Sequence, residues 1–160
     1  MLFLGGINWE LVPDTSGKTV VNLIQGLNHA DSRYPKLLRF LRNFAHRICV
    51  SPQVLDAIRP YAAGPLVLIR NGIPLERCRR RCTDAGSVVI VARKRAEFGE
   101  ALRERMVRTG NRVEVLITWT PRETFLARLG TADIFVGLPY QAEGFYLPAL
   151  EAMASGCAVV

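Results

Sequence analysis

The segment from residue 143 to residue 160 constrains the fold of this chain more than any other. It reads Glu-Gly-Phe-Tyr-Leu-Pro-Ala-Leu-Glu-Ala-Met-Ala-Ser-Gly-Cys-Ala-Val-Val. Gly144 permits backbone angles that a side chain forbids, and Pro148 fits the first position of a helix. Residues 149–155 favour a helix, Gly156 suits the left-handed position after its end, and the last residues are typical of a buried parallel strand. The segment therefore predicts a loop, a short helix and a strand.

This loop and helix have features that suit a sugar nucleotide. The backbone N–H groups of Phe145, Tyr146 and Leu147 are expected to be free at the helix N-terminus, which attracts phosphate. Glu151 is expected in the first helical turn, where its carboxylate can accept two hydroxyl hydrogen bonds. Glu143, on the loop before, is expected to face the same space. The alternative interpretation is that both glutamates only favour a helix N-terminus.

The same segment resembles the signature of a known family. Its two glutamates, seven residues apart, lie in a phrase similar to the hallmark of retaining glycosyltransferases of the GT-B fold, in glycosyltransferase family 4 (the glycosyl transferases group 1 proteins). The resemblance implies an enzyme that transfers a sugar from a nucleoside diphosphate to an acceptor hydroxyl. It also implies that Glu151 holds the ribose hydroxyls, and that Glu143 and the backbone of residues 144–147 hold the donor sugar.

A basic loop after the strand predicted at residues 87–92 provides a second point of resemblance. The family usually has an arginine there, followed five residues later by a lysine, and both meet the diphosphate. Arg93 matches the arginine, but Phe98 stands at the lysine position. Lys94 and Arg95 are the candidates to supply the missing charge, and the alternative is a solvated loop. Glu143 and Arg93 are thus the predicted catalytic residues.

The second half of the chain alternates between strand and helix patterns. Strands are predicted at 87–92, 112–118 and 133–137, and an amphipathic helix at 97–108 with Phe98, Ala101, Leu102, Arg105 and Met106 near one face. Thr120 to Glu123 forms a predicted capping box for a helix that ends near residue 129. This order predicts an α/β fold with Rossmann-like parallel sheets and helices on both faces. Ligands of such sheets bind beyond the carboxyl ends of the strands, where Arg93 and Glu143 are expected.

The first half contains a similar but less regular pattern. Strands are predicted at 1–6, 19–24, 47–50 and 66–69, and helices at 37–44 and 51–59, the latter capped by Ser51. Asn71-Gly72-Ile73 resembles the family's crossing between two domains. We therefore expect an acceptor-side domain at 1–72, a linker at 73–86 and a nucleotide-sugar domain at 87–160, incomplete at both ends. Gln25 aligns with an acceptor-side histidine of the family and His29 lies close by, so no catalytic histidine is assigned.

These expectations define one main hypothesis and two alternatives. The main hypothesis is a hexosyltransferase of polysaccharide or glycolipid synthesis that uses a donor such as UDP- or GDP-hexose. The resemblance implies that neither a metal nor another cofactor is needed, because the leaving phosphate is thought to deprotonate the acceptor. One alternative is a truncated, non-catalytic nucleotide-binding remnant, and the other is a GT-B sugar-nucleotide epimerase. The sequence leaves the donor base, the donor sugar, the acceptor and the oligomeric state open.

Composition adds limits on partners and location. The chain has 160 residues, a net charge of +7 and 49% hydrophobic residues, and no apolar run approaches the ~20 residues of a membrane span. A cytoplasmic protein is expected, with peripheral contact at the inner membrane surface as a further possibility for the basic residues 77–81. No motif points to nucleic acid. Cys78 and Cys82 do not have the spacing of a zinc ribbon or a redox pair, so free thiols are expected.

Overall fold

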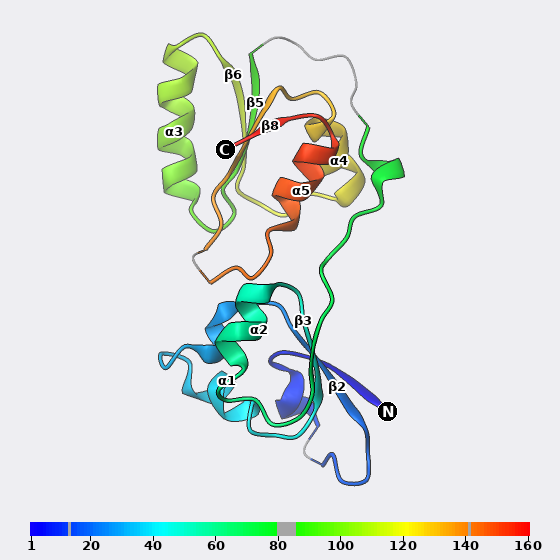
Figure 1. The fold of residues 1–160 in the computed structure, drawn as a ribbon. Coiled ribbons are helices and arrows are strands. Elements are labelled where there is room, and N and C mark those ends of the chain that lie inside the picture. The colour runs from blue at the N-terminus through cyan, green and yellow to red at the C-terminus, as the bar shows by residue number, and fades with distance from the viewer. Residues whose placement is uncertain (13, 80–85, 141) are drawn as a thin grey trace. The chain divides into compact units, whose positions relative to one another are not determined.

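The computed structural model describes residues 1–160 except 13, 80–85 and 141. Contacts divide the chain into two compact units. Unit 1 comprises Met1–Asn71 and Ala142–Phe145, and unit 2 comprises Gly72–Gln141 and Tyr146–Val160. Each unit contains a four-stranded parallel sheet (Figure 1). The α/β class with two helix-flanked parallel sheets is therefore confirmed.

The sheet of unit 1 follows the order of the chain. Its strands are ordered β1-β2-β3-β4 and are all parallel neighbours. The elements of this unit are β1 (Leu2–Gly5), η1 (Asn8–Leu11), β2 (Val20–Ile24), η2 (Leu27–Ala30), α1 (Pro35–Phe40), β3 (His46–Cys49), α2 (Pro52–Ile58) and β4 (Leu66–Leu68), where η denotes a 3-10 helix. The four predicted strands are confirmed, whereas the predicted helix at 37–44 begins earlier and ends at Phe40.

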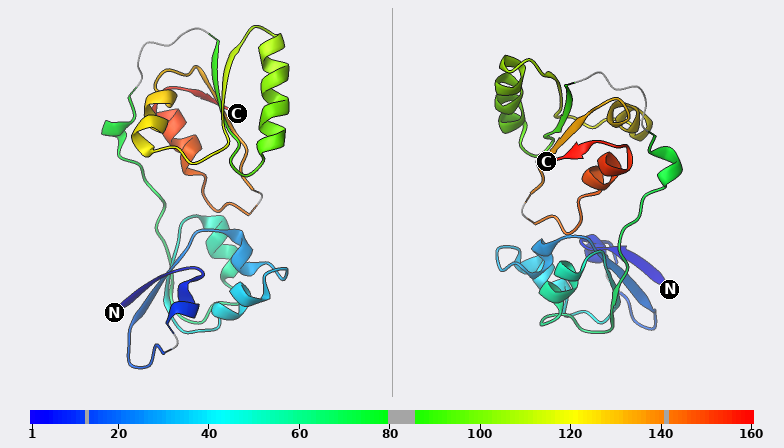
Figure 2. Two further views of the ribbon diagram at one scale, coloured as in Figure 1. Left: turned by 180° about the vertical axis from the view of Figure 1, so that it is seen from behind. Right: turned by 45° about the horizontal axis from the view of Figure 1, so that its top comes forward.

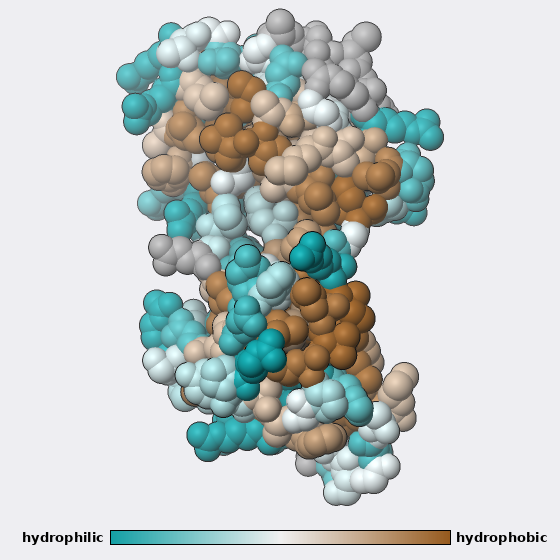
Figure 3. Space-filling view, in the orientation of Figure 1, coloured by the Kyte–Doolittle hydropathy of each residue, from teal (hydrophilic) through white to brown (hydrophobic). Residues whose placement is uncertain are grey.

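Local sequence explains how α2 starts and how the core of unit 1 forms. The Ser51 hydroxyl accepts a hydrogen bond from the N–H of Val54 at 3.2 Å, which confirms the predicted cap. Alternate residues of β2 are buried: Val20 packs with α1, and Ile24 packs with α2. Both helices thus lie on one face of the sheet (Figure 2). Figure 3 shows apolar surface on this unit, which includes exposed side chains along edge strand β4.

The sheet of unit 2 has a strand order that departs from the chain order. The strands are ordered β6-β5-β7-β8, so the chain reverses direction across the sheet after β6. The elements of this unit are η3 (Leu75–Arg77), β5 (Ser87–Val91), α3 (Ala96–Arg108), β6 (Arg112–Leu116), α4 (Arg122–Leu129), β7 (Ile134–Gly137), α5 (Leu147–Ala154) and β8 (Ala158–Val159). Helix α3 covers one face, and α4 and α5 cover the other (Figure 1). The strands and helices predicted in this half are confirmed, with shifted ends.

The packed face of α3 includes Leu102 and Met106, as expected, but is centred on Gly99 and leaves Phe98 out. Gly99 is the buried residue of this helix, and a Cβ built on it would lie 2.3 Å from the Cβ of Ala92. This close approach places Leu102 and Met106 in the core beside it. Phe98, predicted on the packed face, is instead 59% exposed. The side of the helix that carries Gly99 faces the sheet, because only a glycine lets the two backbones approach so closely.

Helix α4 also begins differently from the prediction. Its N-cap residue is Pro121, and no side chain caps it, so the capping box expected from Thr120 is wrong. Glu123 lies in the first turn, where it favours the positive end of the helix dipole. Its carboxylate also faces the guanidinium of Arg77 at 3.7 Å. The remaining residues of the basic run, from Arg80 onward, and Cys82 lie outside the described residues.

Candidate functional site

The N-terminus of α5 lies at the carboxyl end of the sheet of unit 2. Tyr146 is the N-cap of this helix, Leu147 its first residue and Pro148 its second, one position later than expected. Among the described residues, no backbone carbonyl accepts from the N–H groups of Tyr146 or Leu147. Gly156 adopts φ +83° after the helix, which confirms its predicted conformation. The helix dipole and these donors therefore favour an anion at this position.

Glu151 is the most unusual side chain of this helix because it is charged and buried. It is the fifth residue of α5, one position further along than predicted, and only 3% of the residue is exposed. Its Oε1 forms an ion pair with Nη2 of Arg122, the first residue of α4. Burial raises the pKa of the Glu151 carboxyl above its ordinary value, and the Arg122 guanidinium acts in the opposite direction. The carboxylate is thus held in place by one cation.

Arg93 and Tyr146 lie near each other at the same edge of the sheet. Burial raises the pKa of the Tyr146 phenol, and the positive charge of Arg93 acts to lower it. The Tyr146 ring packs 6.4 Å from the ring of Phe135 and directly against Gly137, where a Cβ would lie 2.6 Å from the ring. β7 therefore positions the N-cap residue of α5, and Arg93 close to it is exposed.

Lys94 has an aromatic neighbour at this edge. Its ammonium lies 5.0 Å from the centre of the Tyr140 ring, on the loop after β7. Such cation–π contacts are worth about 0.5–1 kcal/mol at exposed sites. The contact holds Lys94 beside the loop that leads from the sheet to the predicted donor site. Phe98, in the expected lysine position, carries no charge.

The beginning of the signature phrase packs into unit 1. Glu143 forms an isolated antiparallel bridge with Gly26, and Leu27 donates its N–H to the carbonyl of Ala142 at 3.0 Å. Gly144 donates its N–H to the carbonyl of Gln25 at 3.2 Å. The N–H of Gly144, which was expected to help hold the donor sugar, is therefore already used.

Close packing explains why residue 144 is a glycine. A Cβ there would lie 2.4 Å from the Gln25 carbonyl oxygen and 2.4 Å from Cγ2 of Val54. The next residue, Phe145, packs on the apolar cluster that contains Ile24 and Val54. Glu143 is half-buried at the start of this tightly packed segment. The phrase thus needs its glycine for packing in unit 1 rather than for a free N–H.

His29 is a buried residue of unit 1 rather than an exposed polar side chain. It is 6% exposed in η2, with Nδ1 3.2 Å from the carbonyl oxygen of Gly26 and its ring against the backbone of Gly6. Burial lowers the pKa of the imidazole, and the Gly26 carbonyl acts in the opposite direction. Gln25 is exposed. Gln25 thus precedes the residues that pair with Ala142 and Glu143, and His29 lies in the 3-10 helix that begins at the second of them.

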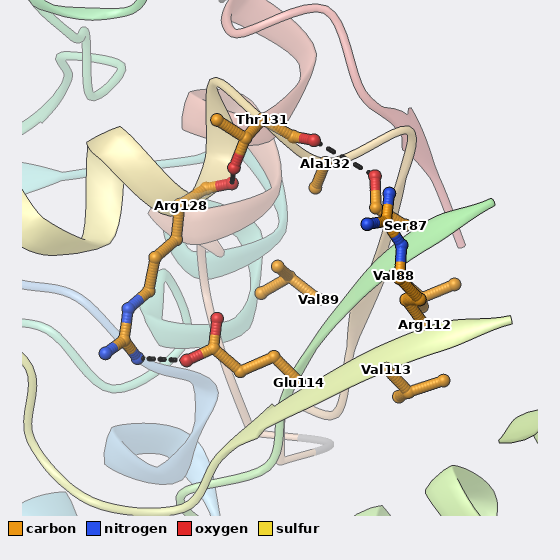
Figure 4. A pocket seen from close by; sticks show the side chains of 9 residues that line it. All are labelled: Ser87, Val88, Val89, Arg112, Val113, Glu114, Arg128, Thr131 and Ala132. Atoms are coloured by element: carbon orange, nitrogen blue, oxygen red, sulfur yellow. Dashed lines mark hydrogen bonds and ion pairs between the residues drawn. The ribbon is translucent and has the colours of Figure 1, made fainter. Parts of the chain in front are cut away.

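The unit 2 sheet has a hollow at its other end, and the described residues include no metal site. A pocket of about 280 Å³ lies at the opposite end of the unit 2 sheet, between the starts of β5 and β6 and the end of α4 (Figure 4). It contains the ion pair between Arg128 and Glu114 at 2.6 Å. No three acidic, histidine or cysteine side chains among the described residues gather as metal ligands, and no helix among them is long and apolar enough to cross a membrane.

Sequence analysis assigned no role to Arg122, although one signal was available. A cation at the first position of a helix opposes the helix dipole, so an arginine there calls for a specific partner. The partner is Glu151, which the phrase had already identified. Cys78 lies in the same buried region, and its pKa is raised first by burial and then by the charge of Glu151. The described cysteines, Cys49, Cys78 and Cys157, are free thiols.

Comparisons with known proteins find likeness at the level of structure. No protein-family model and no curated protein sequence matches the chain. A mutant of S. aureus TarM, crystallised with fondaparinux, alpha-GlcNAc-glycerol and UDP, matches 98% of this chain with a TM-score of 0.65 and 13% identity. A second TarM structure matches 98% with a TM-score of 0.62 and 14% identity. The chain spans 40% and 39% of those two chains. The fold is thus that of the corresponding part of TarM, a GT-B glycosyltransferase.

Proposed function

We propose that this chain carries the nucleotide-sugar site of a retaining glycosyltransferase that transfers a hexose to an acceptor hydroxyl. The observation that supports this most is the buried carboxylate of Glu151, behind a helix N-terminus at the carboxyl end of a parallel sheet. A charged group is seldom buried without a function or a partner. Together with the signature phrase and the fold shared with a GT-B glycosyltransferase, this favours a donor site.

Each predicted residue has a role in the proposal. Glu151 accepts hydrogen bonds from the ribose hydroxyls, and the N-terminus of α5, with the N–H groups of Tyr146 and Leu147, attracts the diphosphate. Glu143 and the loop backbone at Phe145 bind the donor sugar. The Gly144 N–H has no part in this, because Gln25 accepts from it.

The chemistry requires stabilisation of a leaving diphosphate. Negative charge builds on the phosphate as the bond to the sugar breaks, and fixed positive charges stabilise that transition state. Arg93 is the proposed main contact and Lys94, which rests against Tyr140, replaces the lysine that the family has at the position of Phe98. The leaving phosphate takes the proton of the acceptor hydroxyl, so no protein base or metal is assigned.

The acceptor and location remain parts of the proposal. A sugar, polysaccharide or lipid-linked acceptor is consistent with the crystal of the TarM mutant, which contains UDP, fondaparinux and alpha-GlcNAc-glycerol. UDP-hexoses are therefore the donors to test first. A cytoplasmic enzyme with peripheral contact at the inner membrane surface is the corresponding location, and flotation with anionic vesicles tests it.

Nucleotide binding and turnover, measured together, test the proposal. The purified chain is titrated by calorimetry with UDP, GDP and ADP, and then incubated with their hexose conjugates while released hexose and its anomer are followed by NMR. Glu151→Gln should weaken binding by about 1–3 kcal/mol, the scale of a lost hydrogen bond to a charged group. The matched control is Glu97→Gln, an exposed glutamate in the first turn of α3.

The outcomes separate the hypotheses. Binding that Glu151→Gln weakens and Glu97→Gln does not, with release or transfer of a hexose of unchanged anomeric form, supports the enzyme. Binding without turnover would favour a non-catalytic nucleotide-binding protein. Epimerised sugar nucleotide would favour the epimerase, and a folded chain that binds none of the nucleotides would refute the donor site.

A further inference from the structure

The ion pair between α4 and α5 has a feature that helix formation does not explain. Arg122 occupies the first position of α4, where a cation opposes the helix dipole. Its side chain is 45% exposed, whereas that of Glu151 is 4% exposed. The arginine therefore gives up little hydration, while the glutamate is removed from water almost completely. Of the two charged groups, the Glu151 carboxylate is therefore the one that depends on the ion pair.

The surroundings of Glu151 leave it dependent on this one cation. Among the described residues, Arg122 is the only cation paired with the carboxylate. The other titratable group acting there is the buried thiol of Cys78, whose pKa is raised in part by the charge of Glu151. Burial alone favours the protonated, uncharged carboxyl. Arg122 is thus the group that favours the charged form.

We propose that Arg122 is a positioning residue for the nucleotide: it keeps Glu151 ionised and directs one carboxylate oxygen, so that the other remains to accept the ribose hydroxyls. This inference rests on the proposed function of Glu151. A guanidinium that holds Oε1 restricts rotation of the carboxylate, and a charged acceptor forms stronger hydrogen bonds with hydroxyls than a neutral one. Arg122 itself need not touch the nucleotide.

The test is a double-mutant cycle with a pH series. Affinity for the nucleotide that binds best among UDP, GDP and ADP is measured in the wild type, Arg122→Gln, Glu151→Gln and the double variant. Arg122→Gln should weaken binding about tenfold near pH 6 and less near pH 8. Without the arginine the pKa of Glu151 is higher, so the carboxyl stays protonated up to a higher pH than in the wild type. In the Glu151→Gln background, Arg122→Gln should have no further effect.

Two further variants separate positioning from folding. Arg128→Gln removes a different ion pair of α4, with Glu114, and should change neither affinity nor its pH dependence. Arg122→Lys keeps the charge and should restore the wild-type pH dependence in part, although a lysine lacks the planar fork of a guanidinium. Equal losses in Arg122→Gln and Arg128→Gln, or additive losses in the double variant, would overturn the inference.

An NMR measurement distinguishes failure of this inference from failure of the proposed function. The Glu151 carboxyl is titrated by carbon-13 chemical shift in the chain without nucleotide, in the wild type and in Arg122→Gln. A midpoint at least about one pH unit higher in the variant, a tenfold change in proton affinity, is expected. An unchanged midpoint overturns the role of Arg122 whether or not nucleotide binds. A shifted midpoint with no nucleotide binding would overturn the ribose role and the proposed function, and leave only the ion pair.

Discussion

The buried arginine of β3 allows a sharp test of what holds unit 1 together. Arg47 is fully buried, and its guanidinium donates to five backbone carbonyls. Four belong to the turn between α1 and β3, with distances of 3.1 Å to Phe40, 2.9 Å to Leu41, 2.6 Å to Asn43 and 3.4 Å to Ala45. The fifth, Ala63, precedes β4. One side chain thus connects a helix end, a turn and the approach to an edge strand.

The loss of stability expected for Arg47→Met depends on the backbone carbonyls that the substitution leaves without a donor. Replacing a whole buried ion pair by apolar residues can be neutral, but here the carbonyls remain and lose their donor. Leaving a buried acceptor without its donor costs about 1–3 kcal/mol for each group. A unit of this size has a free energy of unfolding of roughly 4–11 kcal/mol, at 0.05–0.15 kcal/mol per residue. Arg47→Met should therefore remove a large part of the stability of unit 1.

Urea unfolding followed by tryptophan fluorescence measures this loss. Trp9 is 5% exposed in unit 1 and Trp119 is 75% exposed in unit 2, so the fluorescence change reports mainly on unit 1. Arg42→Met, at an exposed position of the same turn, is the control and should change stability by less than about 0.5 kcal/mol. Arg47→Lys should give an intermediate loss, because an ammonium has three donors. A loss below about 1 kcal/mol for Arg47→Met, or equal losses for Arg47→Met and Arg42→Met, would refute the reasoning.

Three other substitutions test particular contacts. Gly99→Ala should destabilise unit 2 by about 1–3 kcal/mol through overpacking against Ala92, although alanine is the better helix former; Gly72→Ala, in open space, is the control for thermal unfolding. The lowered pKa of His29 means that the stability of unit 1 is full above its ordinary value of 6.5 and falls as the pH drops below it. His29→Gln should reduce this fall in stability at acid pH, measured by urea unfolding at a series of pH values, whereas His46→Gln, at an exposed position, should not. The raised pKa of Glu151 means that its ionisation costs stability as the pH rises above its ordinary value of 4.5. Glu151→Gln should therefore raise the melting temperature at neutral pH relative to Glu97→Gln, and a fall would show that the ion pair is net stabilising.

The elements that were predictable from the sequence are those determined locally. The apolar strand at Ser87–Val91 and the Ser51 cap of α2 follow from patterns within a few residues, and both are present. Periodicity also found α3 and placed Leu102 and Met106 correctly on its packed face, but it placed Phe98 there instead of Gly99. The face is set by the contact of Gly99 with Ala92, a residue on another element, which a helical pattern within one segment does not contain.

Charged residues in the core were the least predictable feature. Arginine is almost never fully buried unless it is paired, so nothing in the local pattern at residues 46–49 pointed to Arg47 as a core residue. Its acceptors are carbonyls of the turn before it and of Ala63, which only the folded chain brings together. Glu151 was identified from the signature phrase, but its burial and its partner on α4 were not. Both cases depend on tertiary contacts.

The signature phrase is one stretch of sequence, but its first residues belong to unit 1 and the rest to unit 2. The backbone at Glu143 and Gly144 is set by pairing with residues 25–27 in unit 1, where Gly26 is also confined: a Cβ there would lie 2.7 Å from Oδ1 of Asn28. The side chain of Glu151 is set by Arg122 in unit 2. Because the backbone at Glu143 and the side chain of Glu151 are held by different residues, substitutions in these two sets of contacts should have additive effects on stability. The seven-residue spacing is therefore not the only determinant of the site, since the backbone at Glu143 and the carboxylate of Glu151 are each held by contacts in their own unit.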